Sequence, residues 1–86
     1  IQDVKKLLSS FSLSNPFIKF YDENTRADFF SVQNTNNCIL KIFHHYDDKK
    51  VIIVSLIDNL IKGAAGQAVQ SLNVCFGFEE STGLIL

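Results

Sequence analysis

Two neighbouring histidines and two cysteines are the residues of this sequence whose types most often carry chemistry. Paired imidazoles can hold a metal ion or move protons, but adjacent side chains on a strand project to opposite faces. His44 and His45 therefore cannot converge on one ion if they lie on a strand. We expect one of them in the core or at an interface and the other exposed to solvent, and we predict no metal site.

Cys38 and Cys75 could each act as a nucleophile, but neither has a base or an orienting partner at a recognisable spacing. Both lie in apolar patterns, where cysteine behaves as a small buried hydrophobic residue. Without a CxxC pair they form neither a disulfide scaffold nor a four-ligand zinc site, which favours a reducing compartment. Glu79 and Glu80 follow the end of an expected helix, where glutamates are usually solvated. The sequence predicts no catalytic residue in this chain.

The strongest local signal is the start of the last expected helix. Asp58 and Asn59 end a strand and are good helix N-caps, because a short side-chain oxygen accepts hydrogen bonds from free N–H groups. Gly63 and Gly66 follow, although glycine in a helix interior costs about 1 kcal/mol relative to alanine. Either another backbone packs there or a ligand approaches the positive end of the helix dipole. The spacing matches neither a GxGxxG nor a Walker phosphate loop.

The elements before this point follow from hydrophobic periodicity and breakers. A helix is predicted over Gln2–Leu13, because its apolar residues recur at helical spacing, and Pro16 stops it. An aromatic and β-branched strand is predicted over Phe17–Tyr21. The polar segment Asp22–Asp28 has no apolar periodicity and is interpreted as an exposed connection that tolerates deletions.

A β-hairpin is the central structural prediction. Its strands are expected over Cys38–Tyr46 and Val51–Ile57, joined by a charged tip at 47–50. The second strand is apolar on both faces, so helices or another subunit should cover both of its sides.

A helix is predicted over 60–77, in which Gly77 provides the C-terminal cap. Its apolar stripe consists of Ile61, Ala65, Ala68, Val69, Leu72 and Cys75 or Phe76.

Composition limits the class of protein. The chain has 86 residues and a mass of 9.7 kDa, enough for one small core. With 47% hydrophobic residues and a mean hydropathy of +0.14, it is too apolar for a disordered tail and too interrupted for a membrane span. A net charge of −1 with scattered Lys and Arg argues against nucleic-acid or membrane partners. Because it starts at Ile1 and no leader pattern precedes the first periodic segment, the chain is interpreted as cropped or processed. We expect the protein in the cytoplasm.

The helix-start region resembles a known family. The segments 58–70, 72–73, 76–77 and 80–84 are similar to the C-terminal signature of N-acetyl-gamma-glutamyl-phosphate reductases. Upstream, Val32 and the run from Thr35 through Asn36 to Cys38 resemble that family's Val-x-x-Thr-Asn-x-Cys segment. Ile39 departs from the aspartate that often follows. The resemblance spans nearly the whole chain but only the last quarter of the family enzyme.

The resemblance implies an α+β fold: a helix, a sheet containing an antiparallel hairpin, and a C-terminal helix. Residues 1–86 would be the C-terminal part of a catalytic and dimerisation domain, with helix 60–77 packed on an absent N-terminal Rossmann domain. The parent would be an oxidoreductase of arginine biosynthesis and a homo-oligomer, either dimer or tetramer. It would use NADPH to reduce N-acetyl-gamma-glutamyl phosphate to the semialdehyde, through a thioester on an upstream cysteine.

The same resemblance, extended to the wider aldehyde and semialdehyde dehydrogenases, assigns supporting roles to four residues. Asn59 would hydrogen-bond the nicotinamide carboxamide, and its amide offers the donor and the acceptor that this needs. Gly63 and Ala64 would let the cofactor or the Rossmann domain approach, and Lys62 would lie near a phosphate. Most of the NADP would be bound by the missing domain, so the isolated piece would be inactive.

Two other classes of function stay open on the residues alone. One is a free-standing α+β oligomerisation or interaction domain without catalysis, and the other is a small regulatory ligand-binding module. The reductase interpretation requires a Gly-rich dinucleotide segment and a cysteine nucleophile upstream in the same gene.

Overall fold

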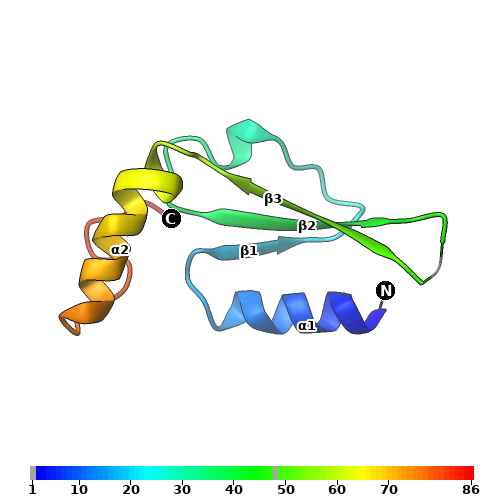
Figure 1. The fold of residues 1–86 in the computed structure, drawn as a ribbon, viewed down its shortest axis with the longest axis horizontal. Coiled ribbons are helices and arrows are strands. Elements are labelled where there is room, and N and C mark those ends of the chain that lie inside the picture. Colours follow the sequence, from blue (N-terminus) through cyan, green and yellow to red (C-terminus); the bar gives the residue numbers. More distant parts are fainter. Residues whose placement is uncertain (1, 48) are drawn as a thin grey trace.

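The protein has a three-stranded sheet with one helix against a face and a second helix at its end (Figure 1). The computed structural model describes residues 2–47 and 49–86. Its helices and strands are α1 (Gln2–Leu13), β1 (Ile18–Tyr21), β2 (Cys38–His44), β3 (Val51–Ile57) and α2 (Gly66–Cys75). Short helical turns lie at η1 (Phe29–Ser31) and η2 (Ile61–Ala65). The predicted α+β class is confirmed.

The hairpin is confirmed as the centre of the sheet. Strands β2 and β3 pair antiparallel from Cys38 opposite Ile57 to His44 opposite Val51. The predicted tip includes position 48, which lies outside the described residues. Strand β1 adds to the other edge of β2 in parallel, with Ile18 opposite Cys38, so the sheet is mixed. The hairpin pattern alone did not indicate this parallel pair, which forms because 22–37 carries the chain back to the starting end of the sheet.

Helix α1 has the predicted bounds and ends as the sequence indicates. Near its C-terminus the Asn15 Nδ2 group donates to the Phe11 carbonyl over 2.9 Å, which satisfies one of the last free acceptors of the helix. Pro16 then prevents continuation. Helix α1 packs on one face of the sheet against β1, which is the edge strand farther from β3.

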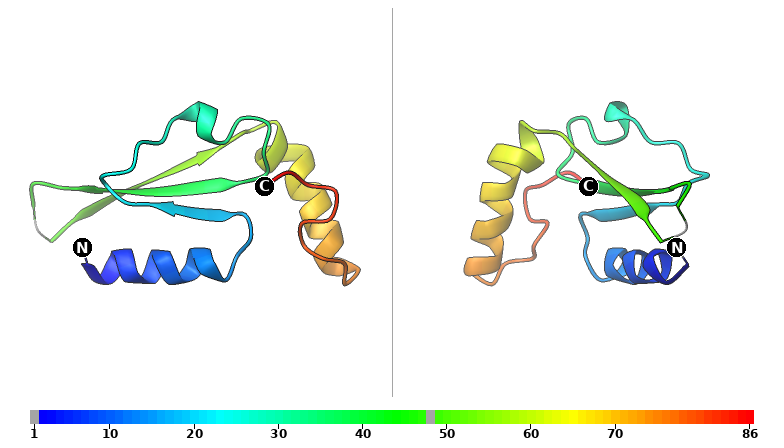
Figure 2. Two further views of the ribbon diagram at one scale, coloured as in Figure 1. Left: turned by 180° about the vertical axis from the view of Figure 1, so that it is seen from behind. Right: turned by 45° about the vertical axis from the view of Figure 1, so that its right-hand side comes forward.

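The core lies on both faces of β2. Ile39 and Ile42 are almost fully buried and, three residues apart on one strand, point to opposite faces. Figure 2 shows α1 along one face and the segment 22–37 along the other. Phe17 and Val32 complete the set of buried hydrophobic residues. Two thin layers therefore cover the centre of the sheet.

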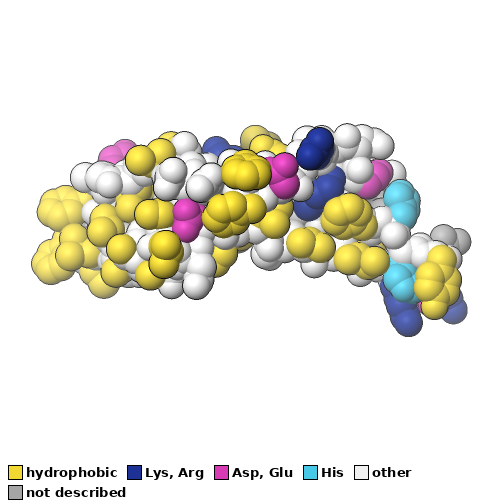
Figure 3. Space-filling model, turned by 90° about the horizontal axis from the view of Figure 1, so that it is seen from above, with side chains coloured by type: hydrophobic (Ala, Val, Ile, Leu, Met, Phe, Trp, Pro, Cys, Tyr) yellow, Lys and Arg dark blue, Asp and Glu magenta, His cyan; other side chains and the backbone are white. Residues whose placement is uncertain are grey.

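Strand β3 lacks the predicted cover within the described residues. Ile52 and Ile53, which point to opposite faces, are 42% and 47% exposed, and Val54 and Ile57 are also exposed. The prediction was wrong about helices of this chain, because α1 packs against β1, the strand farthest from β3, and α2 lies beyond the end of the sheet. Figure 3, which looks onto the face opposite α1, shows apolar side chains along much of the molecule. The other alternative, cover by another subunit, stays a prediction.

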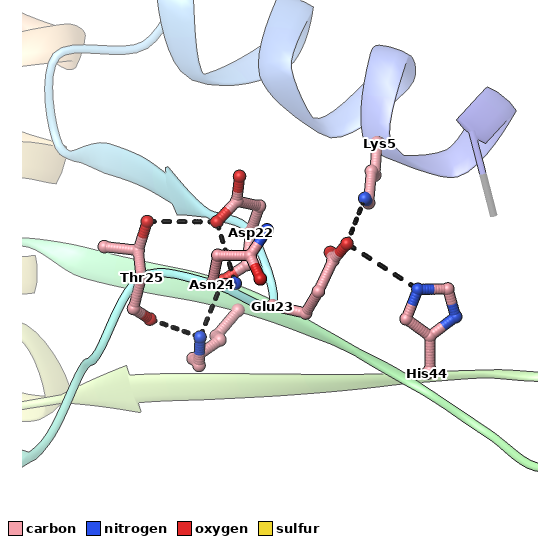
Figure 4. A network of polar contacts seen from close by, with 7 residues as sticks. Lys5, Asp22, Glu23, Asn24, Thr25 and His44 are labelled. Carbon is pink, nitrogen blue, oxygen red and sulfur yellow. Dashed lines mark hydrogen bonds and ion pairs between the residues drawn. The ribbon is translucent and has the colours of Figure 1, made fainter.

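The segment Asp22–Asp28 is partly exposed as predicted, but it is fastened to the sheet (Figure 4). The Nζ of buried Lys41 donates to the carbonyls of Asp22, over 2.6 Å, and of Thr25. The Asp22 carboxylate accepts from the Thr25 hydroxyl and from the Asn24 N–H, both over 3.0 Å. Because these contacts bury a charged amine against backbone carbonyls, a deletion here would leave that amine without partners. These contacts therefore argue against the expectation that the segment tolerates deletions.

Candidate functional site

The helix-start region begins where β3 ends and contains a turn wider than an α-helical one. A π-helical turn over Ile61–Ala65 precedes the regular helix, so the predicted helix over 60–77 is divided into η2 and α2. Such wide turns are uncommon and often occur at functional sites. Gly77 adopts φ +73° and forms the predicted cap. The Phe78 N–H donates to the Asn73 carbonyl over 2.9 Å, which completes a Schellman motif.

Asp58 holds the entry to this turn. Its buried carboxylate accepts the Asn34 N–H at Oδ2 over 2.9 Å and the Leu60 N–H at Oδ1 over 3.0 Å. The first of these bonds ties the end of β3 to the loop before β2, where Asn34 adopts φ +63°. These backbone N–H groups, with that of Asn34 the larger influence, lower the pKa of Asp58 below its ordinary value of 3.8. The Asp58 carboxylate therefore accepts backbone N–H groups before the turn, as expected for a capping side chain, but the N-cap residue of the turn is Leu60 and Asn59 is exposed.

Replacing Asp58 by Asn should lower the thermal stability of the full-length protein at pH 7, because an amide cannot accept from both backbone donors. A carboxyl whose pKa is lowered by folding adds stability at neutral pH, and this stability disappears as the pH falls below 4. The difference in Tm between Asp58→Asn and the natural protein should therefore shrink in acid. Thermal unfolding between pH 3 and pH 7 measures this, and a difference that stays constant would contradict it.

The structure separates the four predicted cofactor residues into two groups. Asn59, Gly63 and Ala64 are exposed, and the Asn59 side-chain amide lies directly beside Gly63. Lys62 is half-buried and points back into the chain, where its Nζ donates to Gln70 Oε1 and lies 5.4 Å from the Phe17 ring centroid. The exposed group is therefore open to a partner, while Lys62 supports the turn from behind.

The structure explains why position 66 is a glycine, and the sequence did not indicate this explanation. A Cβ at this position would overlap the Asn36 Oδ1 atom and lie 2.6 Å from the Ile61 carbonyl oxygen. The space is thus occupied by this chain itself, which corrects the two expectations of an approaching backbone or ligand at Gly66. At Gly63 a Cβ would meet the end of the exposed Asn59 side chain and Ile57 Cδ1 at 3.5 Å.

A buried polar cluster, which we call the Asn36 cluster, lies behind the helix start and consists of Asn36, Lys62, Gln70 and Glu80. Asn36 Nδ2 donates to Gln70 Oε1 over 2.9 Å, and Gln70 Nε2 donates to Glu80 Oε2 over 2.6 Å. Glu80 is half-buried, so the expectation that it is solvated was wrong. The only earlier signal for Asn36 was its place in an asparagine-rich stretch and in the Thr-Asn motif.

Helix α2 packs on its own chain with a polar face. Gly66 and Asn73 are its buried residues, and Asn73 Nδ2 donates to the carbonyls of Glu80 and Thr82, both over 2.9 Å. The predicted apolar stripe points elsewhere: Leu72 is 50% exposed. Also exposed are Ala65, Ala68, Val69, Cys75 and Phe76. A helix that exposes its apolar stripe and buries its polar face needs a partner outside the described residues.

Comparison with known proteins identifies the family. Residues 1–59 match the sequence model described as semialdehyde dehydrogenase, dimerisation domain. The chain belongs to this family. It is similar to N-acetyl-gamma-glutamyl-phosphate reductases from Karelsulcia muelleri (44% identical over 85 residues, 99% of this chain and 25% of the relative) and Christiangramia forsetii (44% over 86 residues, 100% and 26%). The Methanosphaera stadtmanae reductase is 39% identical over 82 residues, 95% of this chain and 24% of the relative.

Membership of the semialdehyde dehydrogenase family confirms the resemblance inferred from the sequence. It also bears on the exposed strand β3, which lies within the matched residues. The chain spans about a quarter of the length of the curated relatives it matches. The matched dimerisation domain includes all three strands and the exposed β3. The exposed apolar strand thus lies within a part of the chain whose family description names a dimerisation domain.

The two histidines of this semialdehyde dehydrogenase domain have different surroundings. The His44 side chain is 63% exposed, with Nε2 at 3.6 Å from Glu23 Oε1, while His45 is half-buried and accepts the Asp47 N–H at Nδ1. Figure 4 shows the Lys5 and His44 side chains both directed at the same oxygen of the Glu23 carboxylate. Neither histidine lies in the core of the chain, so the alternative that one of them is a core residue was wrong. The alternative that one lies at an interface stays a prediction. Within 2–47 and 49–86 no three His, Cys, Asp or Glu side chains gather in a way that could bind a metal.

The two cysteines have different surroundings. Cys38 is half-buried, and this burial raises the pKa of its thiol, which disfavours a thiolate nucleophile. Cys75 is exposed, so the expectation that it is buried was wrong. It belongs to the stripe of α2 that has no cover in the described part of the chain. Among the described residues, no helix combines the length and apolar character needed to cross a membrane.

Proposed function

We propose that this chain is the C-terminal part of an NADPH-dependent reductase. The parent enzyme converts N-acetyl-gamma-glutamyl phosphate to N-acetylglutamate semialdehyde in arginine biosynthesis, in the cytoplasm. The observation that carries the proposal is 44% identity over 85 residues, almost the whole chain, to a reductase of this name. The cysteine nucleophile and the Rossmann domain belong to the remaining part of the parent, so this piece alone is inactive.

The exposed side of the helix start fits a nicotinamide ring. Asn59 offers one donor and one acceptor on a single exposed amide, which matches the two groups of a carboxamide. Gly63 and Ala64 beside it add almost no bulk, so a flat ring can come close to the backbone. NADPH supplies the hydride, and this chain's residues fix which face of the ring is presented.

Lys62 takes a secondary role in this proposal. Its ammonium group already donates one hydrogen bond to Gln70 Oε1 and lies over the Phe17 ring. Its two other N–H groups could donate hydrogen bonds to a phosphate group. The position of the side chain, however, favours support of the turn.

The two uncovered apolar surfaces belong to different partners in this proposal. The exposed stripe of α2, which includes Leu72, packs on the Rossmann domain of the same chain. The exposed faces of β3, with Ile52 and Val54, pack on a second copy. This division keeps the cofactor residues next to the domain that binds most of the cofactor.

The test is Asn59→Ala in the full-length enzyme. We expect kcat to fall about tenfold or more, because near-attack geometry relaxes when the ring is no longer held. The KM for NADPH should change less, since most cofactor contacts lie on the other domain. Steady-state kinetics with NADPH and N-acetyl-gamma-glutamyl phosphate measure both constants.

Asn24→Ala is the matched control. Asn24 is also exposed, and its hydrogen bond to the Asp22 carboxylate is made by its backbone N–H. It should leave both constants unchanged. Natural kcat and KM in Asn59→Ala would contradict the assignment of Asn59. A gene with no Gly-rich dinucleotide segment and no cysteine before this chain would instead favour the free-standing oligomerisation domain.

A further inference from the structure

The Asn36 cluster joins three segments that are far apart in the sequence. Asn36 lies in the loop before β2, Lys62 and Gln70 lie on η2 and α2, and Glu80 lies in the tail after α2. The backbone of Asn36 is also tied to the tail, because its N–H donates to the Ile85 carbonyl over 2.9 Å. A single residue therefore connects the start of the sheet to the helix through its side chain and to the tail through its backbone.

Asn36 is the most tightly enclosed member. Its exposed fraction is 0%, and within the described residues its Oδ1 atom receives no hydrogen bond. That oxygen lies against Gly66, where a side chain would overlap it, while Nδ2 donates to Gln70. One end of the amide thus fixes the distance to the helix backbone, and the other end fixes the rotation of the helix through Gln70.

The cluster and the exposed group lie on opposite sides of the same turn. Lys62, which is held from behind through Gln70, is next in sequence to Gly63, which faces Asn59. A rotation of the turn that releases Lys62 would therefore move Asn59 and Gly63 as well. The cluster has the geometry to set the orientation of the exposed group.

We propose that Asn36 is a positioning residue: through Gln70 and Gly66 it holds the helix start in the orientation that places Asn59 against the nicotinamide. This inference rests on the proposed function above. Asn36 does not touch the cofactor in this proposal and acts through its neighbours. A comparable error in placement, far from the reacting atoms, can lower the rate about a hundredfold.

The experiment exchanges the amide at position 36 and the carboxylate at position 80, the two ends of the hydrogen-bonded series Asn36–Gln70–Glu80, in the full-length enzyme. In Asn36→Asp the new carboxylate faces the Gln70 Oε1 atom, so two acceptors meet and no hydrogen bond forms. If the Gln70 amide flips, its oxygen instead faces the Glu80 carboxylate, and two acceptors meet there. Glu80→Gln alone leaves an acceptor for Gln70 Nε2. In the double variant Asn36→Asp with Glu80→Gln, Gln70 can turn and find a donor and an acceptor again. Because Asn36 Nδ2 and Lys62 Nζ donate to the same Gln70 oxygen, the carboxylate at position 36 in the double variant lies within reach of Lys62 and replaces that acceptor.

We expect kcat of Asn36→Asp to fall about tenfold per active site, with the KM for NADPH changed by about twofold at most. The primary deuterium isotope effect from deuterated NADPH should rise, because hydride transfer becomes slower relative to other steps. Backbone hydrogen exchange over 59–66 should become faster. Glu80→Gln should have little effect, and the double variant should return all three quantities to near natural values.

The outcomes separate a positioning role from a purely structural one. Loss of active protein alone would lower the yield of active sites but leave the isotope effect and kcat per site unchanged, and that result would overturn the inference. Failure of the double variant to recover in any of the three measurements would also overturn it. A natural enzyme with no NADPH-dependent reduction of the acyl phosphate would refute the proposed function instead. Hydrogen exchange over 59–66 would still decide whether Asn36 orients the turn.

Discussion

Gly66→Ala should destabilise the full-length protein by about 2 kcal/mol, which is within the usual range for overpacking a filled site. Helix propensity alone predicts the opposite sign, since alanine is about 1 kcal/mol better than glycine in a helix. Packing decides here, because the new Cβ would overlap the Asn36 side chain and lie 2.6 Å from the Ile61 carbonyl oxygen. Asn36 is fully buried and cannot swing away. Thermal or denaturant unfolding measures the change.

Gly63→Ala is the matched control in the same helix start. The new Cβ would meet only the free end of the exposed Asn59 side chain and Ile57 Cδ1 at ordinary contact distance. We therefore expect stability equal to or slightly above that of the natural protein. If both alanine variants lost the same stability, the space at Gly66 would not be set by Asn36, and an external partner would explain both glycines.

Ile52→Lys should dissociate the homo-oligomer of the full-length protein. Ile52 is 42% exposed on the face opposite α1, beside its cross-strand partner Phe43, which is 37% exposed. If a second copy covers this face, a buried ammonium group would have no partner, and association should weaken by roughly a hundredfold. Analytical ultracentrifugation over a range of concentrations measures the dissociation constant.

Leu72→Lys is the control on the other apolar surface. Leu72 is 50% exposed on α2, which we assign to the Rossmann domain of the same chain. This variant should keep the natural oligomeric state and weaken NADPH binding. An Ile52→Lys protein with unchanged association, or a Leu72→Lys protein that dissociates, would show that the two surfaces are wrongly assigned.

The elements that the sequence predicted well depend on short-range physics. Helix α1 has the predicted bounds because its apolar spacing and Pro16 act within one or two turns. The hairpin and the cap at Gly77 likewise depend on neighbouring residues. The resemblance in segment 58–70 went further and indicated the family, because a long run of specific residues carries more information than periodicity.

The predictions that failed concern which side of an element is covered. The apolar stripe of α2 and the apolar faces of β3 were recognised as surfaces that need cover, and both are exposed in this chain. The stripe was assigned to an absent domain, which stays a prediction, whereas the alternative that helices of this chain cover β3 was wrong. Periodicity shows that a face needs a partner, and it does not show whether the partner lies in the same chain. For the same reason the burial of Cys75 was predicted wrongly.

From residue order alone, the main helices and strands could be stated, because each reflects a local pattern, and a resemblance added the family and the candidate group around Asn59. The parallel β1–β2 pair, the inward turn of Lys62 and the pairing of Asn36 with Gly66 could not. Asn36 and Gly66 are thirty positions apart, and their contact exists only when the loop, the helix and the tail have packed together. Contacts of that separation are chosen by the whole fold, because no local preference distinguishes the partner that a buried amide will meet.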